Sequence, residues 1–138
     1  MSRIIHCIRR DSLSPVRRGK GIVNFPVVTK KLGARSIHSG LTYLPPGAAV
    51  PLHSHHAEEF VIILKGQIKF WLDGTEYECG LHDSTFIGAN VKHEFINSGT
   101  EEALALVTYG AADITRTFAD TGKEVVLGSD DDRFDTSD

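Results

Sequence analysis

Two histidines and a glutamate that lie close together are the residues in this sequence best suited to chemistry. His53 and His55 are two residues apart, and Glu59 follows four residues after His55. Successive side chains of an extended strand point to opposite sides, so both imidazoles would lie on the same side. Imidazole and carboxylate groups can bind a metal ion or transfer protons. This segment is therefore the first candidate for a functional site.

The neighbours of these residues are alternatives. A register slip by one residue would exchange His55 for His56 and Glu59 for Glu58, but the odd spacing of both from His53 points them away on a strand. The sequence has no GxSxG, Walker A, GxGxxG or Cys–His signature, so neither nucleotide binding nor covalent catalysis is indicated. The isolated histidines are interpreted as ordinary hydrogen-bonding residues: His6 and His38.

β-Strands must position these residues, because the chain consists of short β-rich segments separated by Gly and Pro. Asp73-Gly74 is a two-residue hairpin signal that predicts antiparallel pairing of 67–73 with 75–79. The predicted strands are 22–28, 37–44, 60–65, 67–73, 75–79, 84–87, 93–97, 103–109 and 114–118. Many short strands at regular spacing predict an all-β, antiparallel sandwich or barrel.

The candidate segment also resembles a known family. Residues 47–66 match the first conserved motif of the cupin superfamily without a mismatch, with Gly47, His53, His55, Glu59 and Gly66 at the motif positions. The resemblance implies a small cupin-type antiparallel β-barrel, also called a double-stranded β-helix or jelly roll.

Residues 82–97 resemble the second cupin motif. His93 and its closing Asn97 have the expected spacing, whereas His82, Gly88 and Asn90 stand where the family usually has Gly, Pro and Gly. Asn tolerates positive φ better than most residues, so Asn90 can still form the turn that Gly would make.

The resemblance implies that one divalent metal binds inside the barrel, with the ligands His53, His55, Glu59 and His93. Three neutral imidazoles and one carboxylate suit Fe, Mn, Ni, Co, Cu or Zn, and the absence of Cys argues against a purely structural zinc. An octahedral ion would keep two positions for water, substrate or dioxygen. Glu94, next to His93, is expected to face away from the metal.

Two classes of function are consistent with such a site. The first is a metal-dependent enzyme acting on a small organic molecule, either as a dioxygenase or as a non-oxidative isomerase, cyclase or decarboxylase. The second is a non-catalytic protein that binds or senses a small ligand in the same cavity. An isomerase needs a second titratable group near the metal, for which the sequence offers only distant candidates: Tyr43, Tyr77 and Lys69.

Composition and charge limit the remaining possibilities. A chain of 138 residues with 41% hydrophobic and 24% charged residues suits one globular domain. No apolar run approaches the roughly 18 residues of a membrane span, and the first residues lack the apolar segment of a secretory signal, so we expect a cytoplasmic protein without a membrane partner. Nucleic acid is not an expected partner either, because no stacking aromatics accompany the basic residues.

The N-terminal quarter of the chain differs in charge from the rest, and three regions are expected. Residues 1–35 hold nine Lys or Arg against one acid, and the remainder holds six against seventeen. We therefore expect a basic N-terminal arm with one strand over 1–35, packed on an acidic body. The cupin barrel is expected over 36–127, and 128–138 is expected to be a solvated acidic tail.

One strand predicts an interface. In 60–65 the side that carries Phe60, Ile62 and Leu64 is apolar, although it lies opposite the side that faces the barrel interior. Exposed apolar strips of this kind mark interfaces. We expect a homodimer in which the N-terminal segment contributes strands or contacts to its neighbour.

Overall fold

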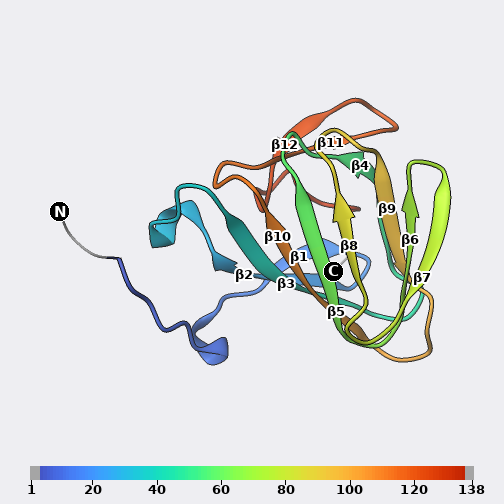
Figure 1. Ribbon diagram of the computed structural model, residues 1–138, viewed down its shortest axis with the longest axis horizontal. Helices are drawn as coiled ribbons and strands as arrows, with labels where there is room; N and C mark the ends of the chain where they lie inside the picture. The colour runs from blue at the N-terminus through green and yellow to red at the C-terminus, as the bar shows by residue number, and fades with distance from the viewer. Residues whose placement is uncertain (1–3, 136–138) are drawn as a thin grey trace.

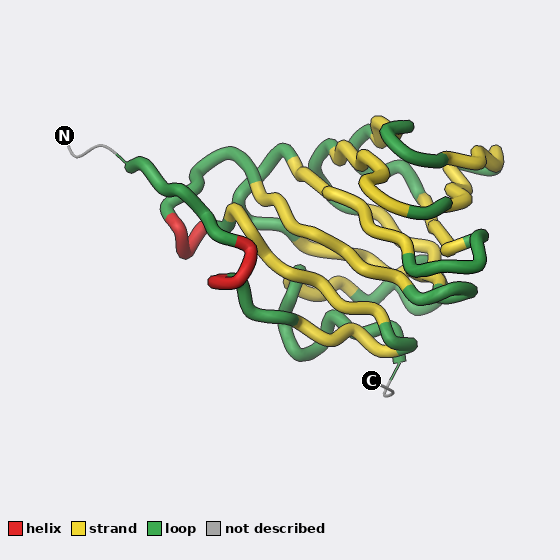
Figure 2. The backbone as a smooth tube through the Cα atoms, turned by 90° about the horizontal axis from the view of Figure 1, so that it is seen from below, coloured by secondary structure: helices red, strands yellow, loops and turns green. Residues whose placement is uncertain are grey.

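The computed structural model describes residues 4–135, which form two six-stranded sheets facing each other (Figures 1 and 2). Two short 3₁₀ helices accompany them, η1 (Arg10–Ser12) and η2 (Lys30–Leu32), and no helix of the described part is long and apolar enough to cross a membrane. The strands are β1 (Val16–Gly19), β2 (Ile22–Val28), β3 (His38–Leu44), β4 (Ala49–Ser54), β5 (Glu59–Lys65), β6 (Ile68–Leu72), β7 (Thr75–Cys79), β8 (Ser84–Ile87), β9 (His93–Asn97), β10 (Ala103–Tyr109), β11 (Thr115–Phe118) and β12 (Glu124–Val126).

Strands far apart in the sequence are neighbours in both sheets. The first sheet has the order β1-β2-β3-β10-β5-β8, and the second has the order β12-β11-β4-β9-β6-β7. Every pairing is antiparallel, and β10 and β9 each lie between strands that precede them by many residues. This arrangement confirms the predicted all-β barrel of the jelly-roll or double-stranded β-helix type.

Each of the nine predicted segments contains a strand, with bounds that agree to within one residue. The prediction missed β1, β4 and β12 among the described residues. Within β4, Pro51 has no N–H to donate, and proline inside a strand normally argues against one. The pairing of β4 with β9 shifts register between Val50 and His53, so Pro51 is accommodated at an irregularity in the ladder.

The turns beside the site have left-handed residues where they were expected. Asp73 and Gly74 have φ values of 46° and 93°, as a two-residue hairpin requires. Asn90 has a φ of 66°, which confirms that it forms the turn usually made by Gly. Its N–H donates to the carbonyl oxygen of His55 at 2.7 Å, so this turn also holds the candidate segment in place.

The hydrophobic core lies between the two sheets. Along β10 the inward residues Ala103, Ala105, Val107 and Tyr109 are all buried, and Val61 and Ile63 of the adjacent β5 are fully buried. Removing each large apolar side chain from water contributes about 1.5–3 kcal/mol. Strict alternation in these central strands therefore fixes which side chains face the interior.

The outer side of β5 remains open to solvent among the described residues. Phe60 and Leu64 are 42% and 38% exposed, and Phe86 of β8, directly opposite Phe60, is 66% exposed. The two strands of the 1–35 region, β1 and β2, pair with each other and with β3 of the same chain rather than covering this strip.

The C-terminal segment is exposed at 128, 130, 131 and 135, as expected for a solvated tail, but it packs on the barrel at Asp132 and Phe134, where that expectation is wrong. Asp132 is fully buried and forms ion pairs with Arg18 and Arg116, and the ring of Phe134 lies 5.0–5.1 Å from the two guanidinium carbons. The N–H of Phe134 donates to the carbonyl oxygen of Arg18 at 2.7 Å. The acidic composition of the segment did not indicate that one of its carboxylates, that of Asp132, pairs with buried arginines. This pairing holds the segment on the barrel.

Candidate metal centre

The four residues that the cupin resemblance assigns to a metal converge between the sheets. They come from β4 and the residue after it, from the start of β5 and from the start of β9: His53, His55, Glu59 and His93. Each is at most 3% exposed. One ligand atom from each lies within 4.8 Å of the others, compared with about 4.2 Å between opposite ligands of an ion that binds at about 2.1 Å.

Each histidine ring is oriented so that Nε2 is available to a metal. Since a carbonyl oxygen can only accept, the Nδ1 that faces one must carry a hydrogen, and in the neutral ring Nε2 then presents a lone pair. The three Nδ1–H groups donate to main-chain carbonyl oxygens, His53 to Pro51 at 2.6 Å, His55 to Thr115 at 2.8 Å and His93 to Val91 at 2.8 Å. Such partners orient the ligands of metal sites.

Glu59 presents an oxygen to two of these nitrogens. Its Oε1 lies 2.9 Å from Nε2 of His93 and 3.6 Å from Nε2 of His55. All three atoms are buried, and with the three rings neutral and their hydrogens on Nδ1 no hydrogen lies between these atoms. Buried lone pairs that face one another are unfavourable unless a cation lies between them. The donor set therefore fits a divalent transition metal.

Burial keeps the imidazoles of His53 and His55 in the neutral form that binds metal. It lowers the pKa of His53 well below its ordinary value and lowers the pKa of His55 to about 4, with the positive charge of Arg116 acting in the same direction on both. Neutral imidazoles bind a cation without first releasing a proton.

The alternation of side chains correctly separates the cluster from its neighbours. His56 and Glu58 are exposed, whereas His55 and Glu59 are buried. Glu94 is half-buried, between the buried His93 and Phe95 in the alternating pattern of β9. The predicted facing of all three neighbours away from the cluster is confirmed.

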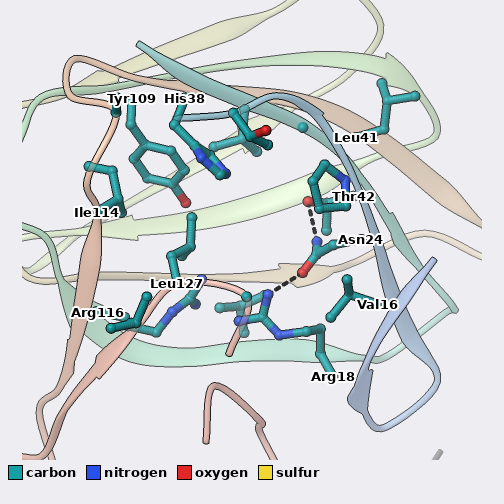
Figure 3. Close-up of a pocket in the computed structure, with 18 of the residues that line it drawn as sticks. Val16, Arg18, Asn24, His38, Leu41, Thr42, Tyr109, Ile114, Arg116 and Leu127 are labelled. Carbon is teal, nitrogen blue, oxygen red and sulfur yellow. Dashed lines mark hydrogen bonds between the residues drawn. The ribbon is translucent and has the colours of Figure 1, made fainter. Parts of the chain in front are cut away.

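A cavity of about 380 Å³ lies beside the cluster, and His53 forms part of its wall. Figure 3 shows this cavity with side chains such as Tyr109, Ile114 and Arg116 around it. Most of the wall is apolar and includes Val50, Phe95, Ile114 and Leu127. Cavities of roughly this volume hold small organic ligands. The candidate metal centre therefore opens into a space that could hold a substrate.

Two titratable side chains that the sequence reasoning did not place at the site line this cavity. The ring of Tyr109 lies 4.8 Å from that of His55 and 5.9 Å from that of His38. Neither the Tyr109 hydroxyl nor the His38 imidazole has a hydrogen-bond partner among residues 4–135, and His38 is half-buried at the cavity wall. The alternation of β10 could have indicated Tyr109, because it shares the inward side with Val107.

The distant candidates lie elsewhere. Tyr43 packs edge-on against Phe25, Tyr77 is 48% exposed, and Nζ of Lys69 lies 3.8 Å from a carboxylate oxygen of Glu78. None of these three lines the cavity beside the cluster. His6, the other isolated histidine, is exposed.

Two buried arginines form another wall of the cavity. Arg18 donates to the main-chain oxygen of Asp132 and to Oδ1 of Asn24, and it also forms an ion pair with the Asp132 carboxylate. Nε of Arg116 lies 3.1 Å from the other carboxylate oxygen. Burial lowers the pKa of Arg18 to about 10, which still leaves it charged at neutral pH.

Comparison with known proteins agrees with the fold and the motifs. The family model of the cupin domain matches residues 40–109, half of the chain, so this protein belongs to the cupin family.

Two curated relatives come from Streptomyces. Polyketide synthase CurC of Streptomyces cyaneus is 30% identical over 92 residues, which cover 66% of this chain and 60% of CurC. Protein SchB of Streptomyces halstedii is 31% identical over 94 residues, which cover 67% of this chain and 68% of SchB. The chain thus matches less than two thirds of the length of CurC.

The structure of the polyketide cyclase RemF from Streptomyces resistomycificus is similar with a TM-score of 0.70, at 18% identity. The match covers 93% of this chain and 89% of RemF. At this identity the likeness shows a shared fold alone.

Proposed function

We propose that this protein is a metal-dependent enzyme of the cyclase or isomerase class, acting on a small polycarbonyl compound. The observation that carries the proposal is the arrangement of a buried three-histidine, one-glutamate cluster beside a cavity that also contains two unpartnered titratable side chains, Tyr109 and His38. A divalent ion at the cluster would polarise a substrate carbonyl. The relatives support the polycarbonyl class, since CurC is described as a polyketide synthase and RemF as a polyketide cyclase.

The two side chains suit opposite roles in proton transfer. Burial raises the pKa of Tyr109, so its hydroxyl stays protonated at neutral pH and can donate a hydrogen bond to a substrate oxygen. Burial lowers the pKa of His38, so its imidazole is neutral and can accept a proton from a carbon between two carbonyls. A dioxygenase would need no such pair, and their presence favours the non-oxidative reaction.

Anaerobic purification followed by elemental analysis tests the metal. We expect about one divalent ion per chain, from among Fe, Mn, Ni, Co, Cu and Zn. His55→Ala should lose most of this metal without unfolding, because the core around the site is apolar, and His56→Ala is the matched control that should keep it. Equal metal content in the two variants would contradict the assignment.

Turnover tests the reaction. The metal-loaded protein is incubated with a panel of poly-β-carbonyl compounds, and products are followed by mass spectrometry with an oxygen electrode in parallel. We expect product without oxygen consumption, and a loss of about 100-fold or more in Tyr109→Phe and in His38→Gln with metal content unchanged. Oxygen consumption would favour a dioxygenase instead, and binding without turnover by any metal form would favour the non-catalytic ligand-binding alternative.

The exposed strip on β5 and β8 supports a homodimer as part of this proposal. Phe60, Leu64 and Phe86 form an apolar outer surface, and an exposed surface of this kind marks an interface. The first described residues extend away from the sheets, with Ile4 and Ile5 59% and 76% exposed, and could contact a second copy (Figure 1). Light scattering should give twice the 15.1 kDa chain mass, and Phe86→Lys should return the monomer. A monomeric wild-type protein at micromolar concentration would contradict the dimer.

A further inference from the structure

Arg116 is a buried cation whose hydrogen-bonding capacity is largely unused. Its side chain is 6% exposed and lies in the cavity wall. Its Nε lies 3.1 Å from Oδ1 of Asp132, while Nη1 is buried and has no partner within residues 4–135. A guanidinium has five N–H groups, and no hydrogen bond of the described chain engages either terminal nitrogen here.

The buried network of Arg18, Asp132 and Arg116 carries one more positive than negative charge, and the other buried carboxylate nearby, Glu59, belongs to the candidate metal centre. Arg18 is held by the carboxylate and the main-chain oxygen of Asp132 and by Asn24, so it already uses the negative charge of Asp132. Two guanidinium groups thus share one carboxylate in a buried environment. An unpaired buried charge is strongly unfavourable unless something else neutralises it.

The position of Arg116 relates this charge to the candidate metal centre. Arg116 is the buried residue of β11, and Thr115 just before it accepts the Nδ1–H of His55 at 2.8 Å. Figure 3 shows Arg116, Tyr109 and His38 around the same cavity. A ligand that reaches the cluster past His53 would therefore also lie near this guanidinium.

We propose that Arg116 forms an anion subsite that binds a negatively charged oxygen of the substrate, either an enolate or a carboxylate. This inference rests on the proposed function and specifies its substrate class as acidic carbonyl compounds. The guanidinium fork matches a planar anion with its two terminal N–H groups. If His38 accepts the proton from carbon, the electron pair of the C–H bond moves onto the carbonyl oxygen, and Arg116 stabilises the charge that develops there.

Calorimetric titration tests the subsite, in both the metal-loaded and the chelator-treated protein. Three probes separate the sources of the anion: levulinate carries a carboxylate, acetylacetone forms an enolate as pH rises, and methyl levulinate is the neutral match of levulinate. We expect levulinate to bind at least about tenfold more tightly than its methyl ester even without metal, because a charge-assisted hydrogen bond is lost in the ester. A different result would indicate an enolate subsite. Acetylacetone would then bind more tightly as its enolate forms, and the affinity for levulinate would be no higher than the affinity for its methyl ester.

Variants distinguish the subsite from a structural role. Arg116→Met should weaken binding of the anionic probe about 10- to 100-fold while leaving the methyl ester unchanged, and Arg116→Lys should recover part of the loss. Lys69→Met changes net charge equally at a position outside the cavity and should have no effect. Should Arg116→Met fail to fold, the affinities of the chelator-treated wild-type protein for levulinate and for its methyl ester still show whether the cavity recognises an anion.

Two outcomes would overturn the inference. Equal affinity of wild-type protein for anionic and neutral probes would show that Arg116 does not recognise charge. Anion binding that survives Arg116→Met in the metal-loaded protein would place recognition at the metal alone. Either result leaves the proposed enzyme class intact, since metal content and turnover test that class separately.

Discussion

Replacement of Asp132 tests the structure most directly, because its carboxylate is fully buried between two arginines. Asp132→Asn removes the negative charge and leaves Arg18 and Arg116 as buried cations without a counterion. The new amide oxygen could keep the hydrogen bond that Oδ2 now accepts from the N–H of Gly128 at 2.9 Å. Removing one partner of a buried ion pair costs about 3–5 kcal/mol.

Urea unfolding of the chelator-treated protein measures this loss as a lower free energy of unfolding. Asp113→Asn is the matched control, since its carboxylate lies 3.1 Å from Nζ of Lys30 and both side chains are largely exposed. Exposed ion pairs contribute about 0–1 kcal/mol, so the control should change little. High salt should weaken the small effect of the control and leave that of Asp132→Asn nearly unchanged.

The result that would refute this reasoning is a loss for Asp132→Asn no larger than that for Asp113→Asn. The C-terminal segment would then not be held against the barrel, and the buried network of Arg18, Asp132 and Arg116 would not exist in solution. A large loss restored in part by Arg116→Met in the same chain would instead confirm that surplus positive charge is the cause.

Two further predictions concern stability. The metal-free protein should become less stable as pH falls from 6.5 to about 4, because the unfolded chain binds a proton at His55 before the folded chain does. The lowered pKa of this one residue, about 4, corresponds to a loss of about 3 kcal/mol in the free energy of unfolding. Urea titrations at neutral and acidic pH measure the change, and equal stability would contradict the burial of the imidazole. Gly66→Ala should destabilise more than Gly74→Ala, since a Cβ at Gly66 would lie 2.9 Å from the carbonyl oxygen of Glu102, whereas at Gly74 it meets nothing within 4 Å. Both positions have positive φ, so alanine adds a backbone strain of roughly 1–2 kcal/mol at either one. If the two variants lowered the thermal unfolding temperature equally, the contact at Gly66 would be absent.

The strands and the metal cluster could be predicted because their signals are local. Alternation along 67–73 and the Asp73-Gly74 turn each lie within a few residues, and the first cupin motif places His53, His55 and Glu59 within seven positions. The distant His93 could be added through its own motif. Pairing of His53 with His93 across β4 and β9 then follows from the fold that the motifs imply.

The cavity groups could not be predicted in the same way. Tyr109 belongs to β10, which lies between β3 and β5, and only this order brings it beside His38 and Glu59. Nothing near Tyr109 or His38 in the sequence indicates that the two face each other. Contacts of this kind depend on which distant strands become neighbours.

Strand β1 and the C-terminal segment meet at the cavity, and the contact between them determines the charge of this wall. A basic 1–35 region and an acidic 128–138 region predict attraction without naming a pair, and the fold selects Arg18 on β1 and Asp132 in the C-terminal segment. Because Arg18 and Arg116 share the single carboxylate of Asp132, this network keeps a net positive charge beside the candidate metal centre. The ion pair that holds the C-terminal segment against the barrel therefore also leaves the positive charge that a ligand in the cavity would meet.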